Sequence, residues 1–102
     1  MKIYCARERD DLSILKRIEG KDFWLLIYLE GRETWIKIYE IEDGWCYGYT
    51  ASEEYMRKVA GTGVGLDWIM CNPEAYMLED IKVFRPVICK SSEEVRYMEG
   101  KE

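Results

Sequence analysis

The dipeptide Asp43-Gly44 separates two segments rich in β-branched and aromatic residues, and it constrains the fold more than any other feature of the sequence. The two central positions of a tight hairpin turn need positive φ angles, which Asp and Gly adopt more readily than most residues. The flanking segments, Thr34–Glu42 and Trp45–Thr50, have the composition of strands. The sequence therefore predicts an antiparallel hairpin in the middle of the chain.

A third strand is expected before this hairpin. Phe23–Leu29 is apolar at every position, which suits a strand buried on both faces, and it is too short for a typical buried helix. Gly31-Arg32-Glu33 is the expected turn to the next strand. Three antiparallel strands in a meander therefore form the centre of the predicted fold, with Phe23–Leu29 as a central strand.

Short helices are expected on either side of the meander. Leu12, Ile14, Leu15 and Ile18 recur at helical spacing, and Gly20 supplies a stop. Ser52 can cap a second helix over Glu53–Val59, which has acids in its first turn and bases in its last, as the helix dipole favours. A last helix is expected over Glu93–Glu99, after Ser91 or Ser92, and Gly61 is expected to end the second.

The remaining segments complete a single α+β domain spanning residues 1–102. Lys2–Ala6 and Asp80–Cys89 have strand character, and Pro86 places the second of these at an edge or a bulge. Leu66–Cys71 fits either a strand or a helix. The expected architecture is an antiparallel β-meander of three to five strands, with two or three short helices on one face of a curved sheet.

Length and charge exclude several classes of protein. The longest apolar run is far shorter than the roughly 20 residues of a membrane-spanning helix, so a membrane protein is not expected. No apolar stretch near the start resembles a signal peptide, and we expect a cytoplasmic location. The net charge of −5 and the pI near 4.9 disfavour direct nucleic-acid binding.

The residues of most active sites are scarce. The chain has no histidine, and its four cysteines form no C-x-x-C pair, so neither a metal site nor a cofactor is expected. The cysteines are expected to act as small buried hydrophobes in a reducing compartment. Acid–base catalysis would depend on carboxylates such as Asp67 or Asp80. We therefore expect a protein that is not an enzyme.

The acidic excess is concentrated in one stretch. Between Lys37 and Arg57 there are five acids and no base, so the charge of this stretch is −5, the same as the net charge of the whole chain. Two interpretations stay open: a solvated rim, or an electronegative surface directed at a basic partner. The five acids are Glu40, Glu42, Asp43, Glu53 and Glu54.

Aromatic residues make up 14% of the chain and alternate along the hairpin. Alternation places Trp35, Lys37 and Tyr39 on one face of their strand, while Trp45, Tyr47 and Tyr49 share a face of the next. Either these rings lie exposed beside the acids, as protein interfaces favour, or helices cover them as core. The candidate partner-binding residues are Trp35, Tyr39, Tyr47 and Tyr49 together with Glu40, Glu42, Asp43, Glu53 and Glu54.

A glycine-rich segment supports a second hypothesis. Gly61, Gly63 and Gly65 could turn backbone N–H groups toward a phosphate, with Arg57 and Lys58 nearby. The segment lacks the Lys and Ser or Thr of a P-loop, and the helix expected before it does not fit a dinucleotide-binding turn. A flexible loop is the other interpretation of the same residues.

Three segments resemble small proteins encoded by phages of gut bacteria: Met1–Ala6, Gly20–Trp24 and Leu78–Val83. The resemblance implies an inhibitor of host defence, of the kind that includes anti-CRISPR proteins, acting in the bacterial cytoplasm. Such an inhibitor would cover the basic nucleic-acid-binding surface of a host nuclease or nucleoprotein complex with its acidic, aromatic face. The alternative is a small-ligand binder that sequesters a nucleotide signal through its aromatics and glycine-rich loop.

Overall fold

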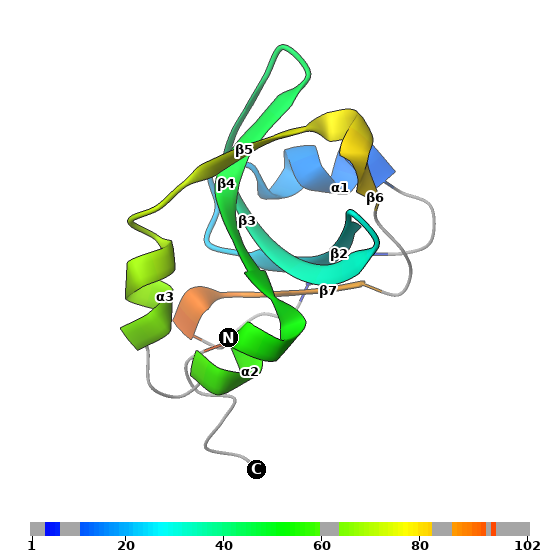
Figure 1. The fold of residues 1–102 in the computed structure, drawn as a ribbon. Helices are drawn as coiled ribbons and strands as arrows, with labels where there is room; N and C mark the ends of the chain where they lie inside the picture. Colours follow the sequence, from blue (N-terminus) through cyan, green and yellow to red (C-terminus); the bar gives the residue numbers. More distant parts are fainter. Residues whose placement is uncertain (1–3, 7–10, 60–63, 83–86, 94, 96–102) are drawn as a thin grey trace.

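The computed structural model describes residues 4–6, 11–59, 64–82, 87–93 and 95. It confirms the α+β class, with short helices packed on an antiparallel sheet (Figure 1). In chain order the elements are β1 (Tyr4–Ala6), α1 (Asp11–Ile18), β2 (Trp24–Leu29), β3 (Arg32–Glu42), β4 (Trp45–Ser52), α2 (Glu53–Val59), α3 (Val64–Ile69), β5 (Glu74–Met77), the 3₁₀ turn η1 (Leu78–Asp80), β6 (Ile81–Lys82) and β7 (Val87–Lys90).

The sheet confirms the predicted meander and extends it. Its strand order is β1-β7-β2-β3-β4-β5, and all pairings between the described strands are antiparallel. β2 is central, as predicted: it pairs with β3 on one side, and on the other with β7 near its beginning and β6 near its end. The β3–β4 hairpin is long, and its tip projects beyond the helices (Figure 1).

Both hairpin turns of the meander use two residues with positive φ. Asp43 and Gly44 have φ angles of 51° and 81°, which confirms the predicted turn between β3 and β4. The turn before β3 lies earlier than the predicted Gly31-Arg32-Glu33. Glu30 and Gly31 have φ angles of 56° and 80°, so they form the turn and Arg32 already pairs with Leu29.

The first two helices follow the sequence closely. α1 ends before Gly20, whose φ of +76° stops the helix as predicted. The hydroxyl of Ser52 accepts a hydrogen bond of 3.0 Å from the Tyr55 N–H, so it caps α2 as predicted. The ambiguous segment Leu66–Cys71 is helical through Ile69, in α3.

The late part of the chain is described only in pieces. Within the strand expected over Asp80–Cys89, β6 and β7 are described, and residues 83–86, which include Pro86, lie outside the described residues. The first strand covers Tyr4–Ala6, and the earlier positions of the predicted range also lie outside the described part. Of the last helix, residues 92, 93 and 95 are helical, and the Val95 N–H donates to the Ser91 carbonyl at 3.0 Å.

Helices cover both faces of the sheet, so the expectation of helices on one face was wrong. The reason is β2, whose apolar residues point to both sides and need cover on both. One core includes Ile14, Leu15, Ile18, Leu25, Ile27, Leu29, Ile36, Ile38, Cys46, Ile81 and Cys89. The other includes Trp24, Trp35, Ala51, Met56, Val59, Leu66, Ile69 and Val95.

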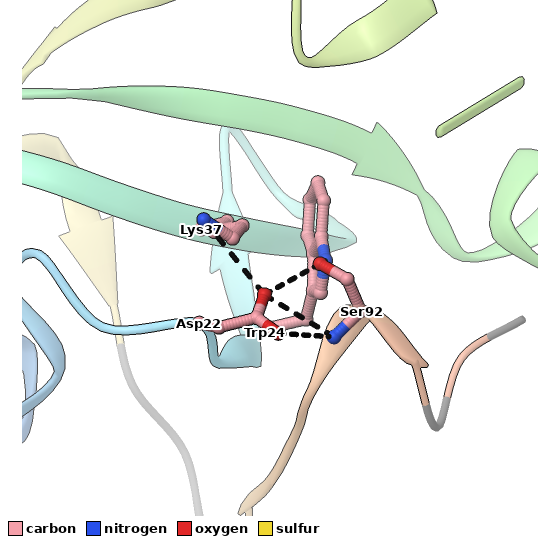
Figure 2. Close-up of polar contacts among 4 residues, drawn as sticks. All are labelled: Asp22, Trp24, Lys37 and Ser92. Carbon is pink, nitrogen blue, oxygen red and sulfur yellow. Dashed lines mark hydrogen bonds and ion pairs between the residues drawn. The ribbon is translucent and has the colours of Figure 1, made fainter. Parts of the chain in front are cut away.

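A polar network ties Ser92, just after β7, to β2 and the residues before it (Figure 2). The buried Trp24 indole N–H donates to the Ser92 hydroxyl at 3.0 Å, and that hydroxyl donates to Asp22 at 2.6 Å. The Ser92 backbone N–H also donates to the Asp22 carboxylate, at 3.2 Å to its nearer oxygen. Ser92 therefore accepts a hydrogen bond from the buried Trp24 N–H, and it connects the residues after β7 to Trp24 of the second core.

Replacing Ser92 by alanine should lower the free energy of unfolding by about 1–3 kcal/mol, because the buried Trp24 N–H would lose its acceptor. Chemical denaturation measures the change. Glu93→Ala, at the exposed neighbouring position, is the control and should have little effect. Equal stability of the two variants would show that the network does not stabilise the fold.

The described cysteines differ in their surroundings. Cys46 and Cys89 are buried, as predicted, whereas Cys71 is exposed, contrary to the prediction. Burial, with a smaller contribution from the Glu19 carboxylate, raises the pKa of the Cys46 thiol from its ordinary value of 9.0 to about 11. Cys46 is therefore a protonated core residue at neutral pH and a poor nucleophile.

Iodoacetamide at about pH 8 should alkylate Cys71 much faster than Cys46, because only the thiolate reacts and Cys71 is exposed whereas Cys46 is buried. Peptide mass spectrometry after timed quenching distinguishes the two sites. Equal labelling rates in native buffer would contradict the buried assignment of Cys46.

The same rise in pKa makes stability depend on pH. The protonated Cys46 thiol favours the folded state below pH 9.0, and this contribution to the free energy of unfolding declines as the pH rises through about 11.

Candidate protein-interaction face

One extra residue in β3 decides which side chains share a face of the hairpin. Ile38 pairs with Gly48, but the next pair is Glu40 with Tyr47, so Tyr39 has no partner across the ladder. This is a β-bulge, and it shifts the alternation of every later residue in β3. We call it the Tyr39 bulge.

A glycine on the neighbouring strand makes room for the Tyr39 bulge. A Cβ atom at Gly48 would lie 2.3 Å from the Lys37 carbonyl oxygen and 3.0 Å from the Ile38 Cα atom. Both contacts are with backbone, which cannot move aside as a flexible side chain could. Gly48 therefore allows β3 to approach β4 closely at this point, a common reason for glycine within a strand.

The loop after α1 holds the opposite edge of the bulge. Pairing of β2 with β3 extends only to Ile36, and beyond it the Gly20 N–H donates to the Ile38 carbonyl at 2.9 Å. The Ile41 N–H donates to the Glu19 carboxylate at 2.8 Å. This hydrogen bond from the Ile41 backbone, together with one from the Lys16 side chain, lowers the pKa of Glu19. The loop thus bonds to β3 on both sides of Tyr39.

The bulge brings acids and aromatic rings to one face. Residues that pair directly across two antiparallel strands point to the same side of the sheet. Glu40 therefore shares a side with Tyr47, and Glu42 with Trp45, while Ile41 pairs with the core residue Cys46. Without the bulge, alternation would direct Ile41 away from this core and the two acids toward it.

The exposed side that results is the candidate site, which we call the aromatic–acidic face. Tyr39, Trp45 and Met77 are large hydrophobic residues with 42%, 41% and 39% of their surface exposed. Met77 joins because β5 pairs it with Trp45, and the Leu78 N–H donates to the Gly44 carbonyl at 2.9 Å beside the turn. The face comprises Tyr39, Glu40, Glu42, Trp45, Tyr47, Tyr49 and Met77.

The tyrosines of the face lie in contact with one another. The Tyr39 ring centroid is 6.4 Å from that of Tyr47 and 5.7 Å from that of Tyr49, and both pairs are tilted. The Lys37 ammonium lies 5.7 Å from the Tyr49 ring centroid and 3.8 Å from the Asp22 carboxylate. Tyr49 also packs against the second core, so it marks the border between buried and exposed residues.

Not all predicted partner-binding residues belong to this face. Trp35 is buried, so it belongs to the core and not to the exposed face. Its indole N–H donates to the Glu53 carboxylate at 2.6 Å, and this hydrogen bond links α2 to the sheet. Glu53 also pairs with Arg57 at 3.0 Å. Glu54 is exposed on α2, beyond the opposite end of β4 from the hairpin turn. Asp43 is exposed in the turn that borders the face.

The residues of the ligand hypothesis are brought together only in part. Gly65 is buried in α3, where an added Cβ would lie 2.1 Å from the Val59 Cγ1 atom, so close packing of α3 on α2 explains this glycine. The expected loop therefore ends before Gly65. Arg57 and Lys58 are exposed on α2. Gly61 and Gly63 lie outside the described residues, so a phosphate-binding loop stays a prediction.

Neither a metal site nor a membrane-spanning helix is found among the described residues. In the described part of the chain, no group of three or more cysteines and carboxylates is placed to hold a metal ion. None of the helices described has the length and apolar character needed to cross a membrane. Comparison with models of protein families, with curated proteins and with solved structures finds no match to this chain.

Two contributors to the face were missed from the sequence. Trp45 was expected to share a side with Tyr47 and Tyr49, but it was not among the candidate residues. Met77 reaches the face through the pairing of β5 with β4, which links positions far apart in the chain. Gly48 within a strand was the one local sign of the bulge.

Gly48→Ala should lower the free energy of unfolding by roughly 1–3 kcal/mol, because the new methyl group overlaps the β3 backbone. Chemical denaturation measures the loss, and amide exchange of Ile41 reports whether the bulge opens. Ala75→Ser, on exposed β5, is the control. Unchanged stability and unchanged exchange in Gly48→Ala would contradict the role given to this glycine.

Proposed function

We propose that this chain is a non-enzymatic binding protein that docks its aromatic–acidic face on a basic surface of a partner protein. The observation that carries the proposal is the Tyr39 bulge, which turns Glu40 and Glu42 to the side of the exposed Trp45 and Tyr39 rings. Apolar rings with polar edges and unpaired charges are the groups that protein interfaces use for contact and for orientation.

The charge on this face favours a cationic partner. Among the described residues, no ion pair involves Glu40, Glu42 or Asp43. Glu40 and Glu42 lie two residues apart on one strand, so their Cα atoms are about 7 Å apart on the same side. Lys37, which pairs with Tyr49 across the hairpin, lies beside the Asp22 carboxylate instead. The field at the hairpin end is therefore negative and attracts basic side chains.

A basic surface that holds nucleic acid is the class of partner we propose. The acids could occupy positions that phosphates otherwise take, and the rings would bury apolar surface around them. The resemblance of three segments to phage-encoded proteins suggests a host nuclease or nucleoprotein complex as that partner. The scarcity of catalytic side chains and the raised pKa of Cys46 support binding rather than catalysis.

The test is a matched pair of double charge reversals. The partner is first isolated with the tagged protein from lysate of bacteria with active nuclease defence complexes, and its dissociation constant is measured by biolayer interferometry. Glu40→Lys with Glu42→Lys should weaken binding roughly tenfold or more, since like charges then face each other. A duplex DNA fragment should compete with the unmodified protein for the partner.

Glu33→Lys with Glu54→Lys is the matched control. Both residues are exposed and lie away from the face, and the change in net charge is the same. The control should alter binding little. Equal weakening by both pairs would show that binding depends on net charge and not on this face, which would contradict the proposal. Unchanged binding in the Glu40/Glu42 variant would also overturn it.

A further inference from the structure

We infer that the aromatic–acidic face recognises arginine in particular, and that the partner's basic surface contacts it through guanidinium groups. This inference rests on the proposed function and specifies the chemistry of its partner. It is carried by the arrangement of rings and carboxylates, which offers more than negative charge alone.

The rings already hold one cation within the chain. The Lys37 ammonium lies 5.7 Å from the Tyr49 ring centroid, within the range at which a cation is attracted to the electron-rich face of an aromatic ring. Only 14% of the Lys37 side chain is exposed, so this position is occupied from within. Tyr39, with 42% of its surface exposed, is the neighbouring ring that remains accessible.

Carboxylates lie beside rings as direct cross-strand neighbours. Glu40 is opposite Tyr47, and Glu42 is opposite Trp45. Cβ atoms of such pairs are about 5 Å apart, so a cation above the ring lies within reach of the carboxylate. The hairpin thus repeats a pair made of one ring and one carboxylate, and the Tyr39 bulge sets both pairs on the same side.

Arginine fits such a pair better than lysine. A guanidinium group is planar and weakly hydrated, so it can stack on a ring while its N–H groups donate to a carboxylate at its edge. An ammonium group is compact and strongly hydrated, and it loses more on leaving water. Tyr39 is restrained by contact with Tyr47 and Tyr49, so ordering it on binding costs little.

Three synthetic peptides test the preference: alternating Gly-Arg, alternating Gly-Lys, and the same sequence with citrulline, the neutral counterpart of arginine. Titration calorimetry gives the dissociation constants, and NMR of the tyrosine rings locates the contact. We expect the arginine peptide to bind about fivefold to tenfold more tightly than the lysine peptide. The citrulline peptide should bind weakest, because it lacks the charge.

Ring variants assign the preference to the face. Tyr39→Leu and Trp45→Leu keep apolar bulk but remove the aromatic ring, and each should reduce the advantage of arginine over lysine. Tyr55→Leu is the matched control, because Tyr55 is 37% exposed on α2, outside the face. This control should keep the full preference.

The outcomes separate this inference from the proposed function. Equal binding of the arginine and lysine peptides, with partner binding still sensitive to Glu40 and Glu42, would overturn the arginine preference and leave the docking proposal standing. If the arginine preference is unchanged in Tyr39→Leu and in Trp45→Leu, the arginine-binding site lies outside the aromatic–acidic face, and the inference is overturned. Absence of any peptide binding, with partner binding insensitive to charge reversal, would overturn both.

Discussion

The Tyr39 bulge is the constraint on which the functional end of this protein depends. On one side the strand can approach β4 because Gly48 has no side chain. On the other, the Gly20 N–H and the Glu19 carboxylate bond to β3 at Ile38 and Ile41, where β2 no longer pairs with it. The bulge is therefore held from both sides, by β4 and by the loop after α1, as a specific feature of the sheet rather than a defect.

The two-sided sheet explains why this end is exposed. Apolar residues on both faces of β2 need cover, which α1 provides on one side and α2, α3 and Val95 provide on the other. Those helices lie over the part of the second face that holds Trp24 and Trp35. The hairpin extends past them (Figure 1), and near its turn Tyr39, Trp45, Glu40 and Glu42 are exposed.

Different side chains of the same types consequently have different roles. Trp35 and Glu53 stabilise the joint between α2 and the sheet, whereas Trp45 and Glu42 lie together on the aromatic–acidic face. Arg57 pairs with Glu53 on α2, and among the described residues no ion pair involves Glu40, Glu42 or Asp43. The end of the hairpin that holds Trp35 therefore contributes to the core, while the end beside the turn carries the exposed rings of the aromatic–acidic face.

Local chemistry determined most of the elements: Asp43-Gly44 specified a turn, Ser52 a helix cap, and the apolar run after Asp22 a central strand. These signals act within a few residues, so the sequence by itself reveals them. Only the tertiary structure decided which aromatics are buried, how the acids divide, and that Met77 joins Trp45. Those outcomes depend on helix cover, on pairing between distant strands and on a one-residue shift in register, and a shift of one residue exchanges the faces of a strand.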